Sequence, residues 1–162
     1  MTLHVETFAG GPIDTNAYLV FDDDSKQILI IDAPMDVDKP LEDHVSELGG
    51  EVVLVVLTHA HWDHIGTTNQ LHNRFSAPVA AHPLTEDRLA HPGNAVMDLP
   101  ITIESVSPDR WLHEGDLVLL GAHEVCCGRN LPMLEARQSA SISDRSKPWN
   151  LRIRTSARCA NA

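Results

Sequence analysis

The sequence is poor in basic residues, and this scarcity excludes several kinds of protein. It contains 12 Lys and Arg against 23 Asp and Glu, a formal net charge of −11. Because an anionic surface repels phosphates, we expect no nucleic-acid partner. No apolar run approaches the roughly 18 residues of a membrane span, and the start, MTLHVETFAGG, lacks the basic and apolar regions of a signal peptide. We therefore expect a soluble, cytoplasmic protein without a membrane partner.

Cysteine is also scarce, and its distribution is uneven. There are three cysteines, which imply no disulfide framework. All three follow Val125, whereas all 10 histidines precede Cys126. Up to Val125 there are 5 Lys and Arg and 21 Asp and Glu, a net charge of −16; from Cys126 onward there are 7 and 2, a net charge of +5. The composition therefore divides the chain at Val125.

Apolar patterns in the first half predict strands and helices in alternation. Three short strands at hairpin-like spacing are expected at 3–8, 16–21 and 28–33. Leu41, Val45 and Leu48 then recur at helical spacing before a Gly-Gly pair, which predicts an amphipathic helix. The continuous run EVVLVVL, residues 51–57, is typical of a strand buried on both faces. Together these segments predict a β-α-β unit.

The pattern weakens further along the chain. We expect a helix over 65–75, a short strand over 77–82, and a helix over 84–91 with Thr85 as its cap. Two more strands are expected at 101–106 and 116–121. Beyond Val125 the periodicity stops, so we predict no regular element there.

The segment LTHAHWDHIG, residues 57–66, follows the buried strand and carries the chemistry. Residues two apart in extended backbone point the same way, so His59 and His61 can converge on one cation. Asp63 and His64 come next and can turn toward a second cation. Imidazole and carboxylate ligands suit zinc, iron or manganese, and two such ions can hold a hydroxide between them. The competing interpretation is a histidine-rich surface loop.

These residues resemble the metallo-β-lactamase superfamily of metal-dependent hydrolases, whose mark is H-x-H-x-D-H at the end of a buried strand. The resemblance covers roughly residues 3–125 and includes the segments TNAYLVFD, ILIIDAP, VAAHP and LHEGDLVLLGAHEV. It implies an α+β fold, an αββα sandwich. It also implies that Asp32, in ILIIDAP, supports the metal site through a ligand; without the resemblance, a strand-end turn residue is an equal interpretation of Asp32.

Within the superfamily, THAHWDHIGTTNQL looks most like glyoxalase II, the hydroxyacylglutathione hydrolases. The resemblance implies that His59 and His61 bind a first metal and that Asp63 and His64 bind a second. It further implies one or two Zn²⁺, Fe or Mn ions, a small-molecule thioester or related ester as substrate, and catalysis by a bridging hydroxide that Asp63 orients.

The later ligands of this family have no match in the chain. The family adds a histidine in P-G-H-[TS]-x-G-S, a bridging aspartate and a last histidine, but no histidine follows Val125 and Asp144 ends no predicted strand. His123 is the nearest candidate, and we interpret it as a surface strand residue. The adjacent Cys126 and Cys127 would point to opposite faces of a strand, so we do not expect them to bind one metal together.

One hypothesis accounts for every change at Val125, namely a shift of the reading frame. Permitted codons for residues 130–143, read from the third base of codon 130, can encode P-A-H-A-G-G-S-S-V-S-I-Y-L, which resembles the family's next segment. We prefer this hypothesis to a divergent native tail. It divides the chain into an incomplete domain at 1–125 and an unrelated, poorly ordered tail at 126–162.

Three functions remain as hypotheses. The first is a metal-dependent hydrolase of thioesters, and the second is a truncated, inactive homologue with a partial metal site. The third is an iron-dependent persulfide dioxygenase of the same superfamily, which needs one metal. The missing later aspartate counts against the third hypothesis as well.

Overall fold

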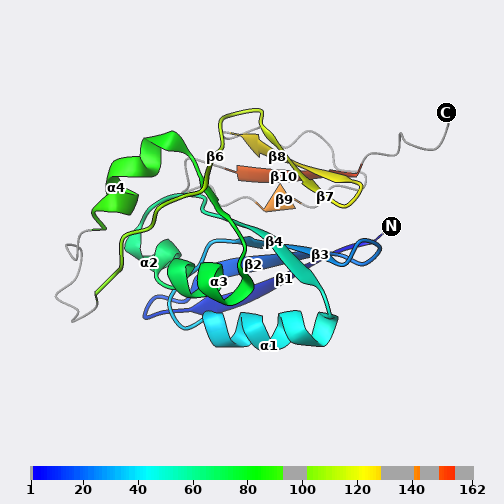
Figure 1. Cartoon of the computed structure of the whole chain (residues 1–162), viewed down its shortest axis with the longest axis horizontal. Coiled ribbons are helices and arrows are strands. Elements are labelled where there is room, and N and C mark those ends of the chain that lie inside the picture. Colours follow the sequence, from blue (N-terminus) through cyan, green and yellow to red (C-terminus); the bar gives the residue numbers. More distant parts are fainter. Residues whose placement is uncertain (1, 93–101, 129–140, 143–149, 156–162) are drawn as a thin grey trace.

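Two sheets packed face to face form the centre of the computed structural model, which describes residues 2–92, 102–128, 141–142 and 150–155. Helices cover the free face of the larger sheet, and the smaller sheet lies against its other face (Figure 1). Strands and helices in these layers make the fold α+β, as the sequence predicts.

The larger sheet has six strands in sequence order: β1 (Leu3–Gly10), β2 (Thr15–Asp22), β3 (Gln27–Ile31), β4 (Glu51–Val56), β5 (Val79–Ala81) and β6 (Arg110–Trp111). The first three pair antiparallel, and the pairs from β3 to β6 are parallel. All the strands predicted between residues 3 and 82 are therefore confirmed, with small differences at their ends.

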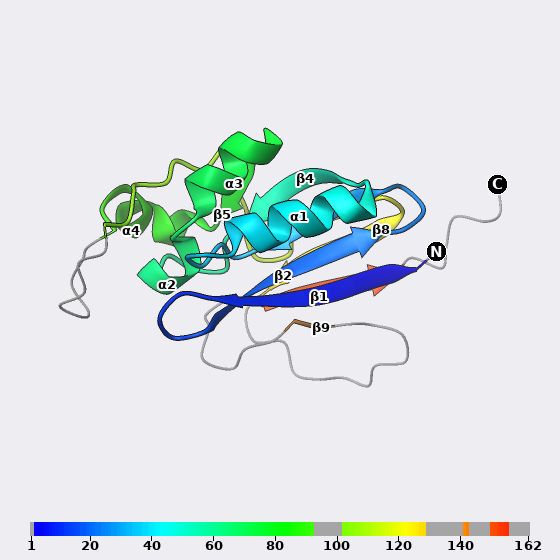
Figure 2. The same cartoon turned by 90° about the horizontal axis from the view of Figure 1, so that it is seen from below.

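Helix α1 (Asp38–Leu48) connects β3 to β4 and completes the predicted β-α-β unit. Its Leu41 and Val45 are buried against the sheet. Gly49 ends the helix because it adopts a left-handed conformation, with φ of 62°, in which its N–H donates to the carbonyl of Val45. Helix α3 lies beside α1 on the same face of the sheet (Figure 2).

The helix predicted over 65–75 begins later, as α3 (Thr68–Phe75), and a separate short helix that was not predicted, α2 (Trp62–Ile65), precedes it. The loop that follows β3 hydrogen-bonds to the chain on either side of the break between them. Ala33 donates its N–H to the carbonyl of His64, and its own carbonyl accepts the N–H of Thr67. These contacts therefore hold the motif against the end of β3.

The next predicted helix is present in two pieces, the 3-10 turn η1 (Pro83–Thr85) and helix α4 (Glu86–Ala90). Thr85 precedes α4 as predicted, but its hydroxyl donates to the carbonyl of His82 and does not cap α4. The strand predicted over 101–106 is wrong for residues 102–106, which form no strand. Ile103 and Val106 are nevertheless buried in the core, which explains their apolar character.

The smaller sheet differs most from the sequence prediction. Its antiparallel strands lie in the order β7 (Leu117–Leu120), β8 (His123–Gly128), β10 (Asn150–Thr155) and β9 (Ser141–Ile142). We expected no regular element beyond Val125, whereas β8 crosses Val125 and β10 pairs with it along its whole length. Within NLRIRT only the four residues LRIR alternate apolar and basic side chains, a window too short to predict a strand from the sequence alone.

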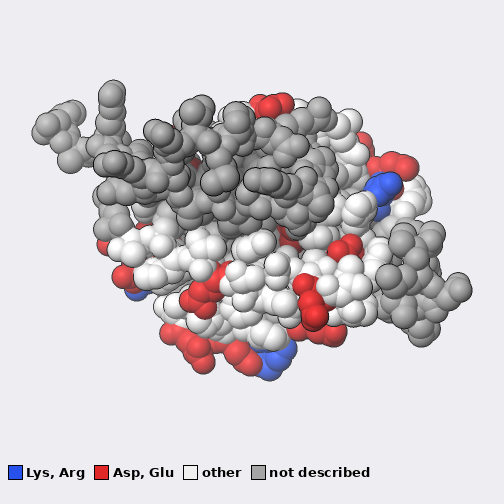
Figure 3. Space-filling model, turned by 180° about the vertical axis from the view of Figure 1, so that it is seen from behind, with Lys and Arg blue, Asp and Glu red and all other residues white. Residues whose placement is uncertain are grey.

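Two cores hold these layers together. One lies between the larger sheet and the helices and includes Ile30, Leu41, Val55 and Leu71. The other lies between the sheets, where Val20 and Ile31 share a cluster with Leu120 and Val125. Among the residues that the structure describes, no helix is long and apolar enough to cross a membrane. Acidic side chains outnumber basic ones on the face shown in Figure 3.

Candidate metal centre

The candidate site lies at the carboxyl ends of the parallel strands β3 and β4. Asp32 directly follows β3, and its N–H donates to the carbonyl of Val56, the last residue of β4, at 2.9 Å. This pairing places Asp32 beside the start of the motif, although 26 positions separate Asp32 from Thr58. Asp32 has φ of 62°, a left-handed conformation that Asp adopts more readily than most residues.

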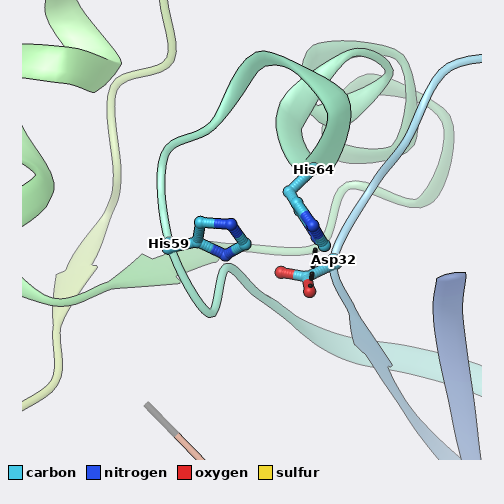
Figure 4. Close-up of side chains that lie close together, drawn as sticks. All are labelled: Asp32, His59 and His64. Carbon is cyan, nitrogen blue, oxygen red and sulfur yellow. Dashed lines mark hydrogen bonds and ion pairs between the residues drawn. The ribbon is translucent and has the colours of Figure 1, made fainter. Parts of the chain in front are cut away.

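The Asp32 carboxylate is fully buried and accepts hydrogen bonds from two directions. Oδ1 accepts the backbone N–H of Thr58 at 2.8 Å, and the Thr58 hydroxyl lies 2.8 Å from Oδ1 and 2.7 Å from Oδ2. On the other side, Oδ2 lies 2.9 Å from Nδ1 of His64, as the dashed line in Figure 4 marks. Asp32 therefore holds both the strand end before the first histidine and the ring of the last one.

The motif's three imidazoles gather in front of this carboxylate. The ring centroids of His59 and His64 are 4.0 Å apart, and those of His59 and His61 are 4.6 Å apart. His59 and His64 are buried, whereas His61 is exposed. Asp63 joins them, since its Oδ2 lies 3.3 Å from Nε2 of His64. The structure thus places His61 beside His59 and Asp63 beside His64, and Asp32 contacts His64 from the other side of its ring.

A contact that the sequence analysis missed holds Asp63 in place. The hydroxyl of Thr15, at the start of β2, donates to Oδ2 of Asp63 at 2.8 Å. Thr15 is 48 positions away in the chain and belongs to a different strand. Thr58 was missed too, although it lies within the motif and its position beside His59 was a usable signal.

The tightest set of metal-binding atoms is Asp32, His59 and His64, whose donor atoms all lie within 4.8 Å of one another. This set includes Asp32 in place of His61 and Asp63. Both oxygens of Asp32 already accept hydrogen bonds, so Asp32 is better placed to orient His64 than to bind a cation itself. In metal sites, a ligand histidine commonly donates its other ring N–H to a carboxylate. The contact of His64 with Asp32 has this form, so these side chains fit a bound metal ion.

His123 lies elsewhere, and its predicted surface position is wrong. It is 1% exposed, at the start of β8, and shares a face of that strand with Val125 and Cys127, which pack between the sheets. Its Nε2 lies 3.5 Å from Oδ1 of Asp22, at the end of β2 opposite to Thr15. The alternation of buried residues along β8 would have predicted this burial if the imidazole had been counted with the apolar side chains.

The cysteine pair follows the predicted alternation, since Cys127 is buried and Cys126 is partly buried. Burial, together with the neighbouring Cys126 and Asp116, raises the pKa of the Cys127 thiol to about 11. Because metals bind the thiolate, this protonated side chain is a poor ligand. In the part of the chain that the structure describes, no second group of three histidine, cysteine or acidic side chains converges as the first one does.

The chain is similar in sequence to known metal-dependent enzymes. The sequence model of the family described as the metallo-beta-lactamase superfamily matches residues 10–125. The chain is 36% identical over 80 residues to a probable metallo-hydrolase of Bacillus subtilis, YqgX, a match that covers 49% of this chain and 36% of YqgX. It is 29% identical over 108 residues to the hydroxyacylglutathione hydrolase of Rippkaea orientalis, covering 67% and 35%.

The fold is also similar to that of a solved metallo-beta-lactamase. The crystal structure of the B3 metallo-beta-lactamase BLEG-1 superposes with a TM-score of 0.69 and 27% identity, over 79% of this chain and 62% of BLEG-1. The matches to YqgX and to the hydroxyacylglutathione hydrolase span about a third of those relatives' lengths. The match to the family model ends at Val125, where the composition of the chain changes.

Proposed function

The chain belongs to the metallo-beta-lactamase superfamily, and we propose that it acts as a metal-dependent hydrolase of thioesters of the hydroxyacylglutathione type. The observation that carries this proposal is the cluster of His59, His61, Asp63 and His64 at the ends of two parallel strands. We assign these four side chains to the metal, His59 and His61 to one ion and Asp63 and His64 to a second. Zn²⁺, Fe or Mn suits such nitrogen and oxygen donors.

The side chains around the cluster have separate tasks in this proposal. Asp32 accepts the Nδ1 proton of His64, so Nε2, which lies beside Asp63, is the nitrogen that would bind the cation. Thr15 donates to one oxygen of Asp63 and so fixes the plane of that carboxylate. Asp63 then orients the attacking water toward the substrate carbonyl. A bound metal would supply Lewis acidity and lower the pKa of its water.

The thioester substrate rests on likeness to relatives. The motif segment and the match to a hydroxyacylglutathione hydrolase both favour it over other esters. Because the match spans about a third of that relative, the activity and substrate of the whole relative are proposals for this chain. We also propose that the chain divides at Val125 into an incomplete domain at 1–125 and an unrelated tail at 126–162.

A second candidate function is an inactive homologue that keeps a partial metal site. The number of donors favours it, because the described residues supply four ligands and no histidine follows Val125 in the sequence. Without a bridging carboxylate, two nearby cations repel each other and bind weakly. This candidate predicts metal retention without turnover.

Metal content and thioester hydrolysis test the two candidates together. The chain is purified without chelators, its metal is measured by mass spectrometry, and hydrolysis of S-lactoylglutathione is followed after addition of Zn²⁺, Fe²⁺ or Mn²⁺. We expect bound metal and measurable hydrolysis, both lost in His59→Ala and Asp63→Ala. His91→Ala is the matched control, because His91 is exposed at the end of α4 and should leave both unchanged.

The outcomes separate the candidates. Metal binding without hydrolysis supports the inactive homologue. A folded protein that binds none of the three metals contradicts both candidates. Oxygen consumption with a persulfide substrate and iron would instead support the dioxygenase of this superfamily.

A further inference from the structure

Thr58 occupies a position between a buried carboxylate and a proposed metal ligand. Its hydroxyl oxygen lies 2.8 and 2.7 Å from the two oxygens of Asp32 and 3.0 Å from Nδ1 of His59. Thr58 is 8% exposed, so water does not compete strongly for these contacts. The backbone N–H of Thr58 also donates to Asp32, which fixes the hydroxyl relative to the carboxylate.

The hydroxyl has one proton to share among these partners, and elementary chemistry decides where the proton goes. An ionised carboxylate only accepts hydrogen bonds. If the Thr58 proton pointed at His59, the lone pairs of the hydroxyl would face those of Asp32 across less than 3 Å in a buried site. The proton therefore lies toward Asp32, and the Thr58 oxygen accepts a hydrogen bond from His59.

This direction fixes the tautomer of His59. Its Nδ1 must carry the proton that the Thr58 oxygen accepts, so in the neutral ring the lone pair is on Nε2. His64 contacts the same carboxylate, since its Nδ1 proton is donated to Oδ2 of Asp32. One carboxylate thus sets both rings, His64 directly and His59 through the hydroxyl.

We propose that Thr58 is a positioning residue. Its hydroxyl donates to the Asp32 carboxylate and accepts the Nδ1 proton of His59, and this relay holds the His59 ring in the tautomer whose Nε2 can bind the metal. The proposal rests on the proposed metal function, because a fixed tautomer matters only if His59 binds a cation. It assigns a task to a residue that touches neither the metal nor the substrate. If the ring exchanged freely between tautomers, only the fraction with a lone pair on Nε2 could bind the metal, and the affinity for the metal would fall by that fraction.

Two substitutions at one position isolate the hydroxyl. Thr58→Val keeps the branched shape and the backbone N–H but removes the hydroxyl, whereas Thr58→Ser keeps the hydroxyl. Nitrogen-15 NMR of the metal-free protein reads the tautomer of His59, assigned by comparison with His59→Ala. Competition with a coloured chelator measures the affinity for Zn²⁺.

We expect the Nδ1–H tautomer in the unsubstituted chain and in Thr58→Ser, and a mixture of tautomers in Thr58→Val. We expect Zn²⁺ affinity to fall by about 10- to 100-fold in Thr58→Val and by less than about 3-fold in Thr58→Ser. Such rescue by serine distinguishes a relay from a packing role. Thermal unfolding of both variants shows whether each is folded before its affinity is compared.

Three results would overturn the proposal. One is an Nε2–H tautomer of His59 in the unsubstituted chain, a result that needs no variant to fold. Another is a Thr58→Val protein with unchanged tautomer and affinity, and the last is a Thr58→Ser protein as weak as Thr58→Val. If the unsubstituted chain binds none of Zn²⁺, Fe²⁺ and Mn²⁺, the proposed function fails, while the tautomer measurement still decides the relay.

Discussion

Oδ2 of Asp32 lies 2.9 Å from Nδ1 of His64, across 32 positions of the chain. The contact joins the end of β3 to the helical turn α2 and fixes the ring that we assign to a metal. Asp32 is fully buried and is surrounded by donors, so the carboxylate is built into the fold before any cation binds. The folded chain therefore holds the Asp32 carboxylate, and with it the His64 ring, in place without a metal ion.

Asp32→Asn should weaken metal binding while leaving the chain folded. An asparagine can still accept the N–H of Thr58, but its amide nitrogen then faces the Nδ1 proton of His64. The ring must turn or change tautomer, so Zn²⁺ affinity should fall by about 10- to 100-fold, as measured by competition with a chelator.

Asp36→Asn is the matched control for that substitution. Asp36 lies in the same loop and has a similar left-handed backbone, with φ of 64°, but its side chain is exposed. Its affinity for Zn²⁺ should equal that of the unsubstituted chain. An Asp32→Asn protein that binds Zn²⁺ as tightly as this control would contradict the orienting role of Asp32.

Gly66→Ala should destabilise the junction between α2 and α3. A β-carbon at position 66 would clash with Cγ of Met35 and lie 3.0 Å from its backbone nitrogen, so the β3 loop must move. The free energy of unfolding should fall by about 1–3 kcal/mol in urea denaturation, as for other overpacked sites.

Met35→Ala is the control for Gly66→Ala. Met35→Ala removes the closest atom, so the double variant should be destabilised by less than the sum of the two single substitutions. The backbone nitrogen remains close, so rescue should be partial. Strict additivity in this cycle would show that the clash with the Met35 side chain contributes nothing.

The predictable and unpredictable parts of this molecule differ in how far apart their contacts lie in the sequence. The run at 51–57 and the helix with Leu41 and Val45 carry their own periodicity, and both were predicted. The contacts of Thr15 with Asp63 and of Thr58 with Asp32 depend on which strands are neighbours and in what register. No local pattern contains that information. The resemblance to a family supplied Asp32, but not the atoms through which it acts.

Asp22 should give the stability a specific dependence on pH. Burial alone would raise its pKa, but hydrogen bonds from the hydroxyl and N–H of Ser25 and the N–H of Asp24, with the nearby His123, outweigh burial and hold the pKa below its ordinary value of 3.8. The folded protein therefore binds this proton less tightly than the unfolded chain. The resulting stabilisation is complete above about pH 4 and is lost as the pH falls through the folded pKa.

Urea denaturation between pH 7 and pH 3 measures this effect. Asp22→Asn removes the titrating group, so its free energy of unfolding should fall less steeply below pH 4 than that of the unsubstituted chain. Ser25→Ala removes the 2.6 Å hydrogen bond and should give an intermediate slope. If the free energy of unfolding fell equally with pH in all three proteins, Asp22 would contribute nothing to the loss of stability in acid.

The last prediction concerns the gene across the break at Val125. Strand β8 crosses this residue without interruption, yet the family match ends there and the charge of the chain changes sign. If the reading frame has shifted, the DNA for codons 130–143, read from the third base of codon 130, should encode P-A-H-A-G-G-S-S-V-S-I-Y-L. Sequencing that stretch checks the prediction directly, and a chain made in the restored frame should bind Zn²⁺ more tightly because it regains a histidine ligand. If no frame across codons 124–143 encodes that segment, the reading-frame hypothesis fails and residues 126–162 are the native continuation of the chain.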